Sequence, residues 1–136
     1  MSKLDKFLGV WELDSSQNIY QTPTAPKKGS YEVILLETNT LKFEMHWTDA
    51  DDHEHEASYT SIVDGNQYPY ENPELADFIE TTLLNEFIMQ TASYKDGKLL
   101  SKGTRELVDK NRTMLVSQET FLPGQTIVNK SIYYKQ

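Results

Sequence analysis

Short turn signals punctuate this 136-residue chain from end to end, and they restrict its fold more than any other feature of the sequence. They recur at roughly the eight- to twelve-residue spacing of all-β barrels and sandwiches. The signals are ETNT at 37–40, DADDH at 49–53, VDGN at 63–66, KDGK at 95–98, DKNR at 109–112 and LPGQ at 122–125. The Asp-Gly pairs among them supply the positive φ angles that tight hairpins need. The pattern predicts consecutive strands joined by hairpins.

The segments between these turns are rich in tyrosine, threonine, valine and isoleucine, which favour strands. The sequence predicts ten strands, at residues 7–14, 29–36, 40–48, 54–63, 66–70, 77–83, 86–94, 98–108, 113–120 and 126–135. Short strands joined mostly by hairpins are typical of a barrel, which leaves no sheet edge exposed. We expect an all-β fold, an up-and-down antiparallel β-barrel of about 8–10 strands, with residues 1–136 as one domain.

Two segments do not follow the strand pattern. Residues 15–28 contain two prolines and little periodicity, which predicts a long irregular connection over one barrel mouth. Residues 72–87 begin with Asn-Pro-Glu, a plausible helix start, and their apolar residues recur at helical spacing. This second segment is either a helix or a turn followed by a strand.

Alternation along each strand assigns side chains to the two faces of the sheet. Phe43, Met45 and Trp47 share one face, and polar or charged residues lie between them. Arg105 shares a face with the glycine and the leucine two residues away on either side. Several predicted strands thus mix polar and apolar side chains on one face, which indicates a barrel with a partly polar lumen.

The composition excludes several classes of protein. The chain has no cysteine, so it forms no disulfide and offers no thiolate nucleophile or metal ligand. Its formal charge of −8, from 21 acidic and 13 basic residues, disfavours binding to nucleic acid or to anionic membranes. No apolar run reaches the roughly 18 residues of a membrane span, and the N-terminus lacks the features of a signal peptide. We expect a cytoplasmic protein without membrane insertion, monomeric or homodimeric, unless a leader has been removed.

The segment DADDHEHE at 49–56 crowds carboxylates around two histidines, His53 and His55. Such a segment can chelate zinc or copper. Because acidic residues are also favoured in hairpin turns, we interpret it as a solvated turn and expect neither a metal nor a cofactor. His46 is predicted to lie on the outer face of its strand.

The triplet Gly9-Val10-Trp11 on the first predicted strand resembles the Gly-x-Trp opening of the calycins, which include the lipocalins and the fatty-acid-binding proteins. The resemblance implies that Trp11 closes one end of the barrel and that Gly9 lets the chain pass close beside it. The C-terminal KSIYYKQ also resembles the last strand of the fatty-acid-binding proteins.

Nearly the whole chain is similar, in order and at matching spacing, to a group of small bacterial lipocalin-like proteins of unestablished function. The shared segments are GVWELDSSQNIY, PTAPKKGSY, YTSIVDGNQYP, DGKLLSKGTREL, RTMLVSQ and the terminal YYKQ. In that group the segment equivalent to 76–87 is a strand and a turn. The resemblance therefore favours a turn and a strand over a helix at 72–87.

The chain departs from the fatty-acid-binding proteins at two places. Those proteins carry a helix pair after the first strand, but residues 15–28 with their two prolines leave no room for one. We therefore expect a barrel without a helix-pair lid. Their last strand presents an arginine and a tyrosine, two residues apart, to the fatty-acid carboxylate, and the corresponding pair here is Ser131 and Tyr133.

Arg105 is the candidate anion-binding residue, because a buried guanidinium is costly unless it is paired. The sequence leaves three possibilities open for Arg105: contact with an acidic ligand, an internal pair with Glu32 or Glu119, or exposure to solvent. The residues predicted to bind a ligand are Phe43, Met45, Trp47, Tyr59, Arg105, Ser131 and Tyr133, and the predicted floor is Gly9 with Trp11.

These residues favour the binding of a small, largely apolar molecule, with or without an acid group, in the lumen and without catalysis. The aromatic face could instead be simple core. Two other functions stay open: a cavity enzyme of isomerase or dehydratase type with Glu32 or Glu119 as base, and a filled barrel that acts through protein contacts. A lumen below about 100 Å³ would favour the filled barrel, since small-molecule pockets start near 300 Å³. A cavity-facing carboxylate with a raised pKa would favour the enzyme.

Overall fold

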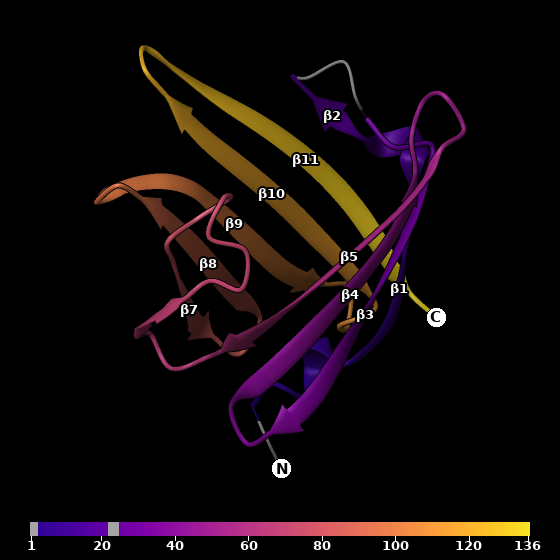
Figure 1. Cartoon of the computed structure of the whole chain (residues 1–136). Helices are drawn as coiled ribbons and strands as arrows, with labels where there is room; N and C mark the ends of the chain where they lie inside the picture. Colours follow the sequence, from indigo (N-terminus) through magenta and orange to yellow (C-terminus); the bar gives the residue numbers. More distant parts are fainter. Residues whose placement is uncertain (1–2, 22–24) are drawn as a thin grey trace.

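The computed structural model describes residues 3–21 and 25–136, and these residues form one antiparallel sheet of eleven strands (Figure 1). The strands are β1 (Gly9–Leu13), β2 (Ile19–Tyr20), β3 (Lys28–Glu37), β4 (Thr40–Thr48), β5 (Glu54–Ile62), β6 (Gln67–Pro69), β7 (Phe78–Asn85), β8 (Ile88–Lys95), β9 (Lys98–Val108), β10 (Thr113–Leu122) and β11 (Gln125–Lys135). The described residues contain no α-helix, only two 3₁₀ turns, η1 (Asp5–Phe7) and η2 (Ser15–Gln17).

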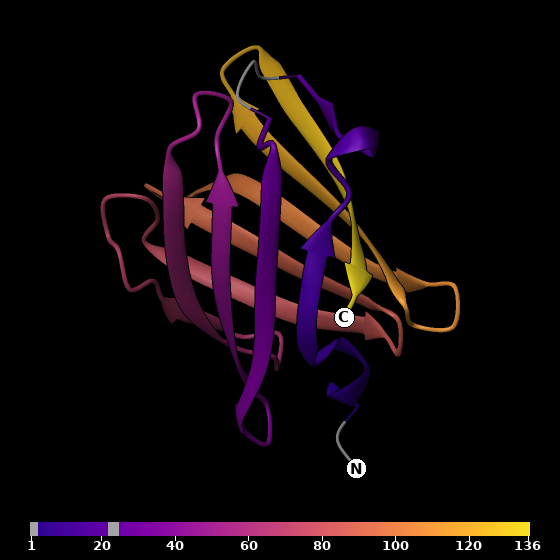
Figure 2. The same cartoon turned by 90° about the vertical axis from the view of Figure 1, so that its right-hand side faces the viewer.

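The sheet curls into a nearly closed barrel. Its strand order is β5-β4-β3-β1-β11-β10-β9-β8-β7-β6, with β1 between β3 and β11 and with β2 beside β11 off this path. The strands from β3 to β5 and from β6 to β11 each pair with the next strand along the chain. In Figure 2 the purple strands β3–β5 run upright, and the orange strands behind them cross obliquely. The remaining seam, between β5 and β7, is held by a bridge from Val63 to Thr81 and by a hydrogen bond between the hydroxyls of Ser61 and Thr81.

All ten predicted strands are present, which confirms the all-β barrel. Residues 72–87 form a turn followed by β7 and the start of the next hairpin, so the strand interpretation is correct and the helix is wrong. The segment 15–28 is less irregular than expected. It contains η2 and the short strand β2, which pairs with β11, while residues 22–24 lie outside the described part of the chain.

Several hairpin-turn residues have positive φ angles, as the Asp-Gly pairs in the sequence predicted. In the β8–β9 hairpin, Asp96 and Gly97 have φ angles of 52° and 76°, and a Cβ on Gly97 would meet nothing within 4 Å. In the β9–β10 hairpin, three consecutive non-glycine residues, Asp109 to Asn111, have φ between 51° and 66°. Asp and Asn tolerate this region better than other residues, which accounts for Asp109 and Asn111 at this turn.

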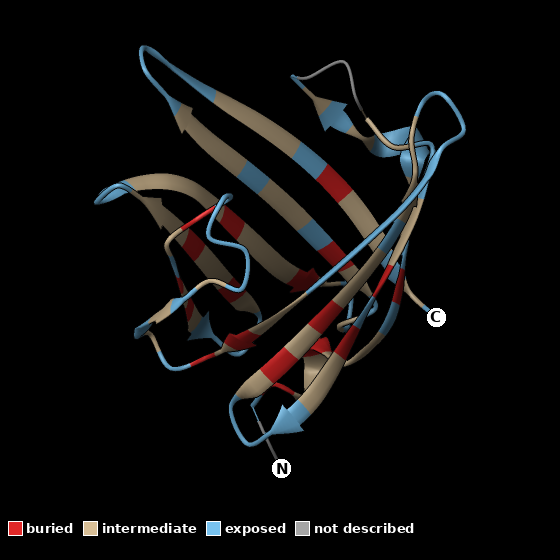
Figure 3. Ribbon diagram, viewed as in Figure 1, coloured by how far each residue is buried: buried red, intermediate tan, exposed pale blue. Residues whose placement is uncertain are grey.

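The packed core gathers at the end of the barrel where the N-terminal segment lies, and the upper part of β5 is exposed (Figure 3). Trp11 is fully buried, and its indole N–H donates to the carbonyl of Phe7 over 3.0 Å. Gly9 has φ +119°, and a Cβ there would come within 3.3 Å of the Lys135 Cε. The backbone path beside Trp11 therefore depends on glycine.

Within residues 3–21 and 25–136, no helix is long and apolar enough to span a membrane.

Candidate ligand-binding site

A cavity of about 310 Å³ lies inside the barrel, above the packed core. It is lined by Met45, Tyr59, Tyr70, Leu75, Ala76, Ile79, Thr91, Ser93, Leu100, Ser101, Gly103, Arg105 and Gln118. The lining comes from β4 and β5 on one side, from β7 to β10 on the other, and from the loop between β6 and β7. The barrel is therefore not a filled cylinder.

Arg105 is the charged group of this cavity. Its Nη2 donates to the Tyr59 hydroxyl over 2.9 Å, and its guanidinium carbon lies 4.4 Å from the Phe43 ring centre and 5.8 Å from that of Tyr31. Arg105 is half-buried as a whole, since part of its surface faces the cavity, but its Nε is shielded from solvent and has no hydrogen-bond partner among the described residues. Aromatic faces and the phenol oxygens of Tyr59 and Tyr31 thus surround a cation whose Nε–H has no acceptor among the described residues.

No carboxylate of the described residues lies within 4.0 Å of the Arg105 guanidinium. The predicted internal partners face the other way: Glu32 pairs across the sheet with Val10 and Glu44, and it alternates with the buried Tyr31 and Val33. The idea that Glu32 serves as an internal counter-charge or catalytic base is therefore wrong.

Glu119 also points outward. It is the cross-strand neighbour of Lys102 and Val128, and it follows Gln118, whose side chain lines the cavity. The period of two along a strand places adjacent residues on opposite faces, so Glu119 cannot share the lumen with Gln118. The second predicted partner or base is wrong for the same reason as the first.

The charge state of this region follows from its surroundings. Burial acts to lower the pKa of Arg105, but the nearby oxygens of Tyr59 and Tyr31 outweigh it and leave that pKa above its ordinary value. Burial raises the pKa of Tyr31 to about 12, with the Arg105 charge acting in the opposite direction. Burial likewise raises the pKa of Tyr133. At neutral pH Arg105 is therefore a cation, and Tyr31 and Tyr133 are neutral phenols.

The structure brings some of the predicted site residues together and separates others. Met45, Tyr59 and Arg105 line the cavity. Phe43 is fully buried beneath the guanidinium and stacks on Tyr59 with ring centres 4.9 Å apart. These four predicted residues form one continuous group in the structure, contributed by β4, β5 and β9.

The other three predicted residues lie outside the cavity lining. Tyr133 packs edge-on against Tyr31, with ring centres 4.7 Å apart. The Ser131 hydroxyl is hydrogen-bonded to that of Tyr20 over 3.0 Å, which ties β11 to β2. Trp47 stacks on the ring of His55 near the end of β4, at 5.3 Å.

Several polar residues of the cavity were not recognised in the sequence as site residues. Thr91 and Ser93 of β8, Ser101 of β9 and Gln118 of β10 all line it. Alternation had placed Ser101 on the face of Arg105, and the same period applied to β8 and β10 could have found the others. The loop between β6 and β7 contributes Tyr70, Leu75 and Ala76, and no local signal indicates that a loop reaches the lumen.

A larger hollow, of about 690 Å³, is lined by residues of β1, β3, β4, β5 and the adjoining segments. It includes the outward-facing cross-strand neighbours Glu12, Ser30, His46 and Glu56, and also Leu13, Gly29, Trp47 and His55 from the other face of the same strands. His46 is thus on the outer face, as predicted. An open surface lined by charges of both signs buries little of a ligand, so the inner cavity is the better candidate site.

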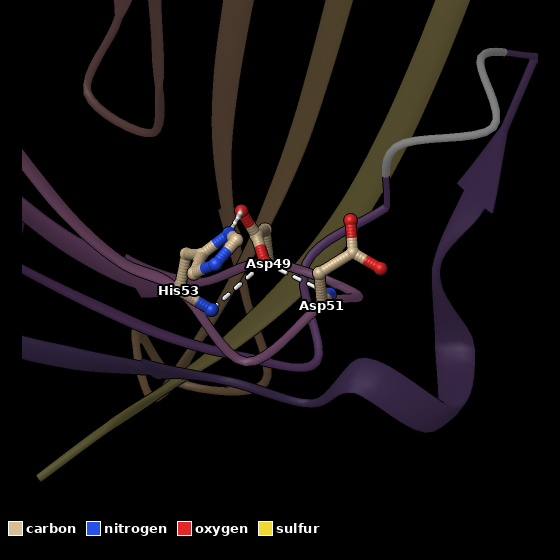
Figure 4. Close-up of side chains that lie close together, drawn as sticks. All are labelled: Asp49, Asp51 and His53. Carbon is tan, nitrogen blue, oxygen red and sulfur yellow. Dashed lines mark hydrogen bonds and ion pairs between the residues drawn. The ribbon is translucent and has the colours of Figure 1, made fainter.

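The acidic histidine segment forms the β4–β5 turn (Figure 4). Ligand atoms of Asp49, Asp51 and His53 lie within 4.8 Å of one another. Asp49 Oδ1 accepts hydrogen bonds from the backbone N–H groups of Asp51 and His53, over 2.8 and 2.9 Å. Asp49 Oδ2 lies 2.7 Å from His55 Nε2. Hydrogen bonds with His55 and with these backbone groups lower the pKa of Asp49 to about 2. Both oxygens are therefore engaged in holding the turn.

Solved structures with the same fold share little sequence with this chain. The fluorescent protein UnaG matches with a TM-score of 0.66 and 11% identity, covering 98% of this chain and 99% of UnaG. Zebrafish ileal bile acid-binding protein, in complex with cholic acid, matches with a TM-score of 0.55 and 15% identity over 96% of this chain and 99% of its own. The siderocalin Ex-FABP matches with a TM-score of 0.50 and 13% identity over 96% and 74%.

These neighbours are β-barrels of the calycin and fatty-acid-binding-protein type, so the fold implied by the resemblance is confirmed. No protein-family model matches the sequence, and no curated protein matches it either.

Proposed function

We propose that the protein binds a small, largely apolar molecule that carries an acid group, and that it holds the acid group against Arg105. The cavity volume, about 310 Å³, reaches the lower end of the range of small-molecule sites, roughly 300–1,000 Å³. Most of the lining near the guanidinium is aromatic or aliphatic. A ligand would gain free energy from burying apolar surface, about 25 cal/mol per Å², and orientation from the cation.

One observation carries this proposal: Arg105 lines an internal cavity, and no carboxylate among the described residues neutralises it. A desolvated, unpaired charge costs several kcal/mol in a protein interior. The rings of Phe43 and Tyr31 offset part of this cost, at about 0.5–2 kcal/mol for each well-placed ring. A ligand carboxylate would supply the missing counter-charge, in the fork geometry that guanidinium groups prefer.

One neighbour of the same fold supports this assignment. The zebrafish protein is in complex with cholic acid, an acid with a large apolar body. A barrel of this type is thus suited to hold such molecules. The cytoplasmic location and the monomeric or homodimeric state remain predictions.

The alternative functions have less support. The enzyme hypothesis named Glu32 or Glu119 as base, and both side chains face away from the lumen. The filled-barrel hypothesis expected less than about 100 Å³ of free volume, and the cavity is about three times larger.

The proposal is tested with a matched pair of probes, 2-naphthoate and the neutral 2-naphthalenemethanol, whose binding is measured by calorimetry. Arg105→Met should weaken 2-naphthoate about tenfold or more, because a charge-assisted hydrogen bond is lost, and should change the alcohol by less than about threefold. Arg112 is exposed and lies outside the cavity, so Arg112→Met removes the same charge elsewhere and should change the affinity for neither probe. Equal effects of Arg105→Met on the two probes would contradict the proposal.

A second measurement identifies the natural ligand. Native mass spectrometry of protein purified from cells, followed by extraction, should release a small acid from the native protein and less of it from Arg105→Met. An extracted molecule without an acid group would also contradict the proposal.

A further inference from the structure

The cavity has two chemically different walls. On one side, Tyr59 stacks on Phe43 at an interplanar angle of 22°, and the Tyr70 ring lies 6.3 Å from that of Tyr59. Met45 extends this surface along β4. Flat aromatic faces and a thioether favour the binding of a flat, polarizable ligand against this wall.

The opposite wall, on β8 and β9, carries hydroxyl groups. Ser93 and Ser101 are cross-strand neighbours whose hydroxyls are hydrogen-bonded to each other, and Thr91 Oγ1 lies 3.1 Å from Thr81 Oγ1. A pair of serine hydroxyls has two O–H donors, and the bond between them uses one. The Ser93–Ser101 pair therefore keeps one donor and several acceptor positions for a third group.

Gln118 of β10 adds an amide to this polar wall. Its side chain lines the cavity, the residue is exposed to solvent, and its amide forms no hydrogen bond with another described residue. The amide lies over Gly103, where a Cβ would be only 2.7 Å from the Gln118 Oε1. Because residue 103 has no side chain, the Gln118 amide can lie flat against β9 and still present its donors and acceptor to the cavity.

The strand register sets the order of these groups along the cavity. Arg105, Gly103 and Ser101 follow one another on one face of β9, with Thr91 and Gln118 flanking Gly103 and Ser93 flanking Ser101. Residues two apart on a strand are separated by about 7 Å. Hydrogen-bonding groups therefore lie one such step from Arg105, beside Gly103, and two steps from it, at the Ser93–Ser101 pair.

A hydrocarbon chain placed against this wall would strip water from the serine pair and from Gln118 without replacing its hydrogen bonds, which is unfavourable. A ligand with a polar edge would replace them. Sites built to hydrogen-bond a ligand group discriminate against the analogue that lacks that group.

We propose that the site selects acids with a flat aromatic body and a further hydroxyl or amide group, over plain aliphatic acids. The aromatic face lies on Tyr59 and Tyr70, and the additional polar group contacts the wall formed by Thr91, Ser93, Ser101 and Gln118. This inference rests on the proposed function, because it takes Arg105 as the site of the acid group.

The test compares 6-hydroxy-2-naphthoate with 2-naphthoate, two rigid acids that differ by one hydroxyl at the end far from the carboxylate, and includes decanoate as an aliphatic acid. Affinities for the full-length protein are measured by calorimetry. The hydroxylated acid should bind about three- to tenfold more tightly than 2-naphthoate, as expected for one additional hydrogen bond. Decanoate should bind more weakly than 6-hydroxy-2-naphthoate.

A variant that combines Ser93→Ala, Ser101→Ala and Gln118→Leu should reduce the preference for the hydroxylated acid to less than about twofold. Ser117→Ala, next to Gln118 but on the other face of β10, should retain it. Near-ultraviolet circular dichroism establishes that each variant is folded. If the triple variant does not fold, the single variant Gln118→Leu takes its place in the test. It removes no hydrogen bond within the described residues, and it should reduce the preference for the hydroxylated acid in part.

The outcomes separate this inference from the proposed function. Equal affinity of the native protein for the two naphthoates, an unchanged preference in the folded triple variant, or tighter binding of decanoate would overturn the polar-wall proposal alone. If Arg105→Met left the affinity for both naphthoates unchanged, the proposed function would fail with it.

Discussion

The guanidinium carbon of Arg105 lies 4.4 Å from the centre of the Phe43 ring, so that a cation of β9 lies over an aromatic face of β4 from the opposite side of the barrel. This contact joins the two halves of the lumen. It also explains how a cation without a carboxylate partner is accommodated in the unliganded protein.

A double-mutant cycle measures the Arg105–Phe43 contact. The cycle of Phe43→Leu and Arg105→Met should give a coupling of about 0.5–2 kcal/mol in the free energy of unfolding, the range of a cation–π contact. Urea denaturation gives the free energy of unfolding of the native protein, the two single variants and the double variant. Losses of stability that belong to one substitution alone cancel in the cycle. Strict additivity of the two substitutions would show that the contact does not stabilise the fold.

Trp11 should be one of the most sensitive positions of the core. Trp11→Ala removes a fully buried ring and a hydrogen bond to the Phe7 carbonyl, and should lower the free energy of unfolding by about 3–5 kcal/mol. Val10→Ala is the matched control, because Val10 is the adjacent residue and is 41% exposed, and it should cost less than about 1 kcal/mol. A loss below about 1 kcal/mol for Trp11→Ala would mean that the ring is not packed as the structure has it.

Alkaline pH should destabilise the fold through Tyr31. Its pKa is raised from 10.0 to about 12 in the folded protein, so between these values the unfolded chain loses a proton that the folded chain keeps. This contribution to stability is complete below pH 10 and is lost as the pH rises through 12, at no more than about 1.4 kcal/mol per pH unit.

Urea denaturation at several pH values from 8 to 12 tests the Tyr31 contribution. In the native protein the Tyr31 hydroxyl donates a hydrogen bond to the Met114 sulfur, so Tyr31→Phe should be less stable than the native protein at pH 8. Above pH 10, Tyr31→Phe should lose stability less steeply than the native protein. Parallel pH profiles for the native protein and Tyr31→Phe would assign the alkaline loss to other groups.

Asp49 should titrate unusually low for a half-buried carboxyl group at a turn. The hydrogen bond with His55 is the main cause of its pKa of about 2, so His55→Ala should raise that pKa in a carboxyl NMR titration. His46→Ala, which removes a histidine near Glu56 instead, serves as the control and should leave it unchanged. Because the folded pKa is lowered, the stabilisation from Asp49 is present above pH 4 and is lost as the pH falls through about 2. An Asp49 pKa near 4 in the native protein would contradict this arrangement of the turn.

Much of the barrel was predictable because its signals are local. A strand needs only a period of two and suitable residues, and a hairpin needs a few residues such as Asp96 and Gly97 that adopt positive φ. These requirements concern neighbours along the chain. Alternation along β4 likewise placed Phe43 and Met45 on one face, and alternation along β9 placed Arg105 with Gly103 and Leu107, before any strand was paired with another. The short β2 was missed because two residues give no period, and it is held by pairing with Asn129 and Lys130 of β11.

The site itself was decided by tertiary structure. By itself, the sequence determined the strands, their turns and the face that Arg105 shares with Gly103 and Leu107. Only the closing of the sheet decided that Arg105 lies against Phe43 and Tyr59, that Glu32 and Glu119 lie outside, and that Trp47 pairs with His55 away from the cavity. The physical reason is that residues of β4 and β9 are far apart both along the chain and across the sheet, so their contact depends on curvature and stagger, which arise from the whole sheet and not from any one strand.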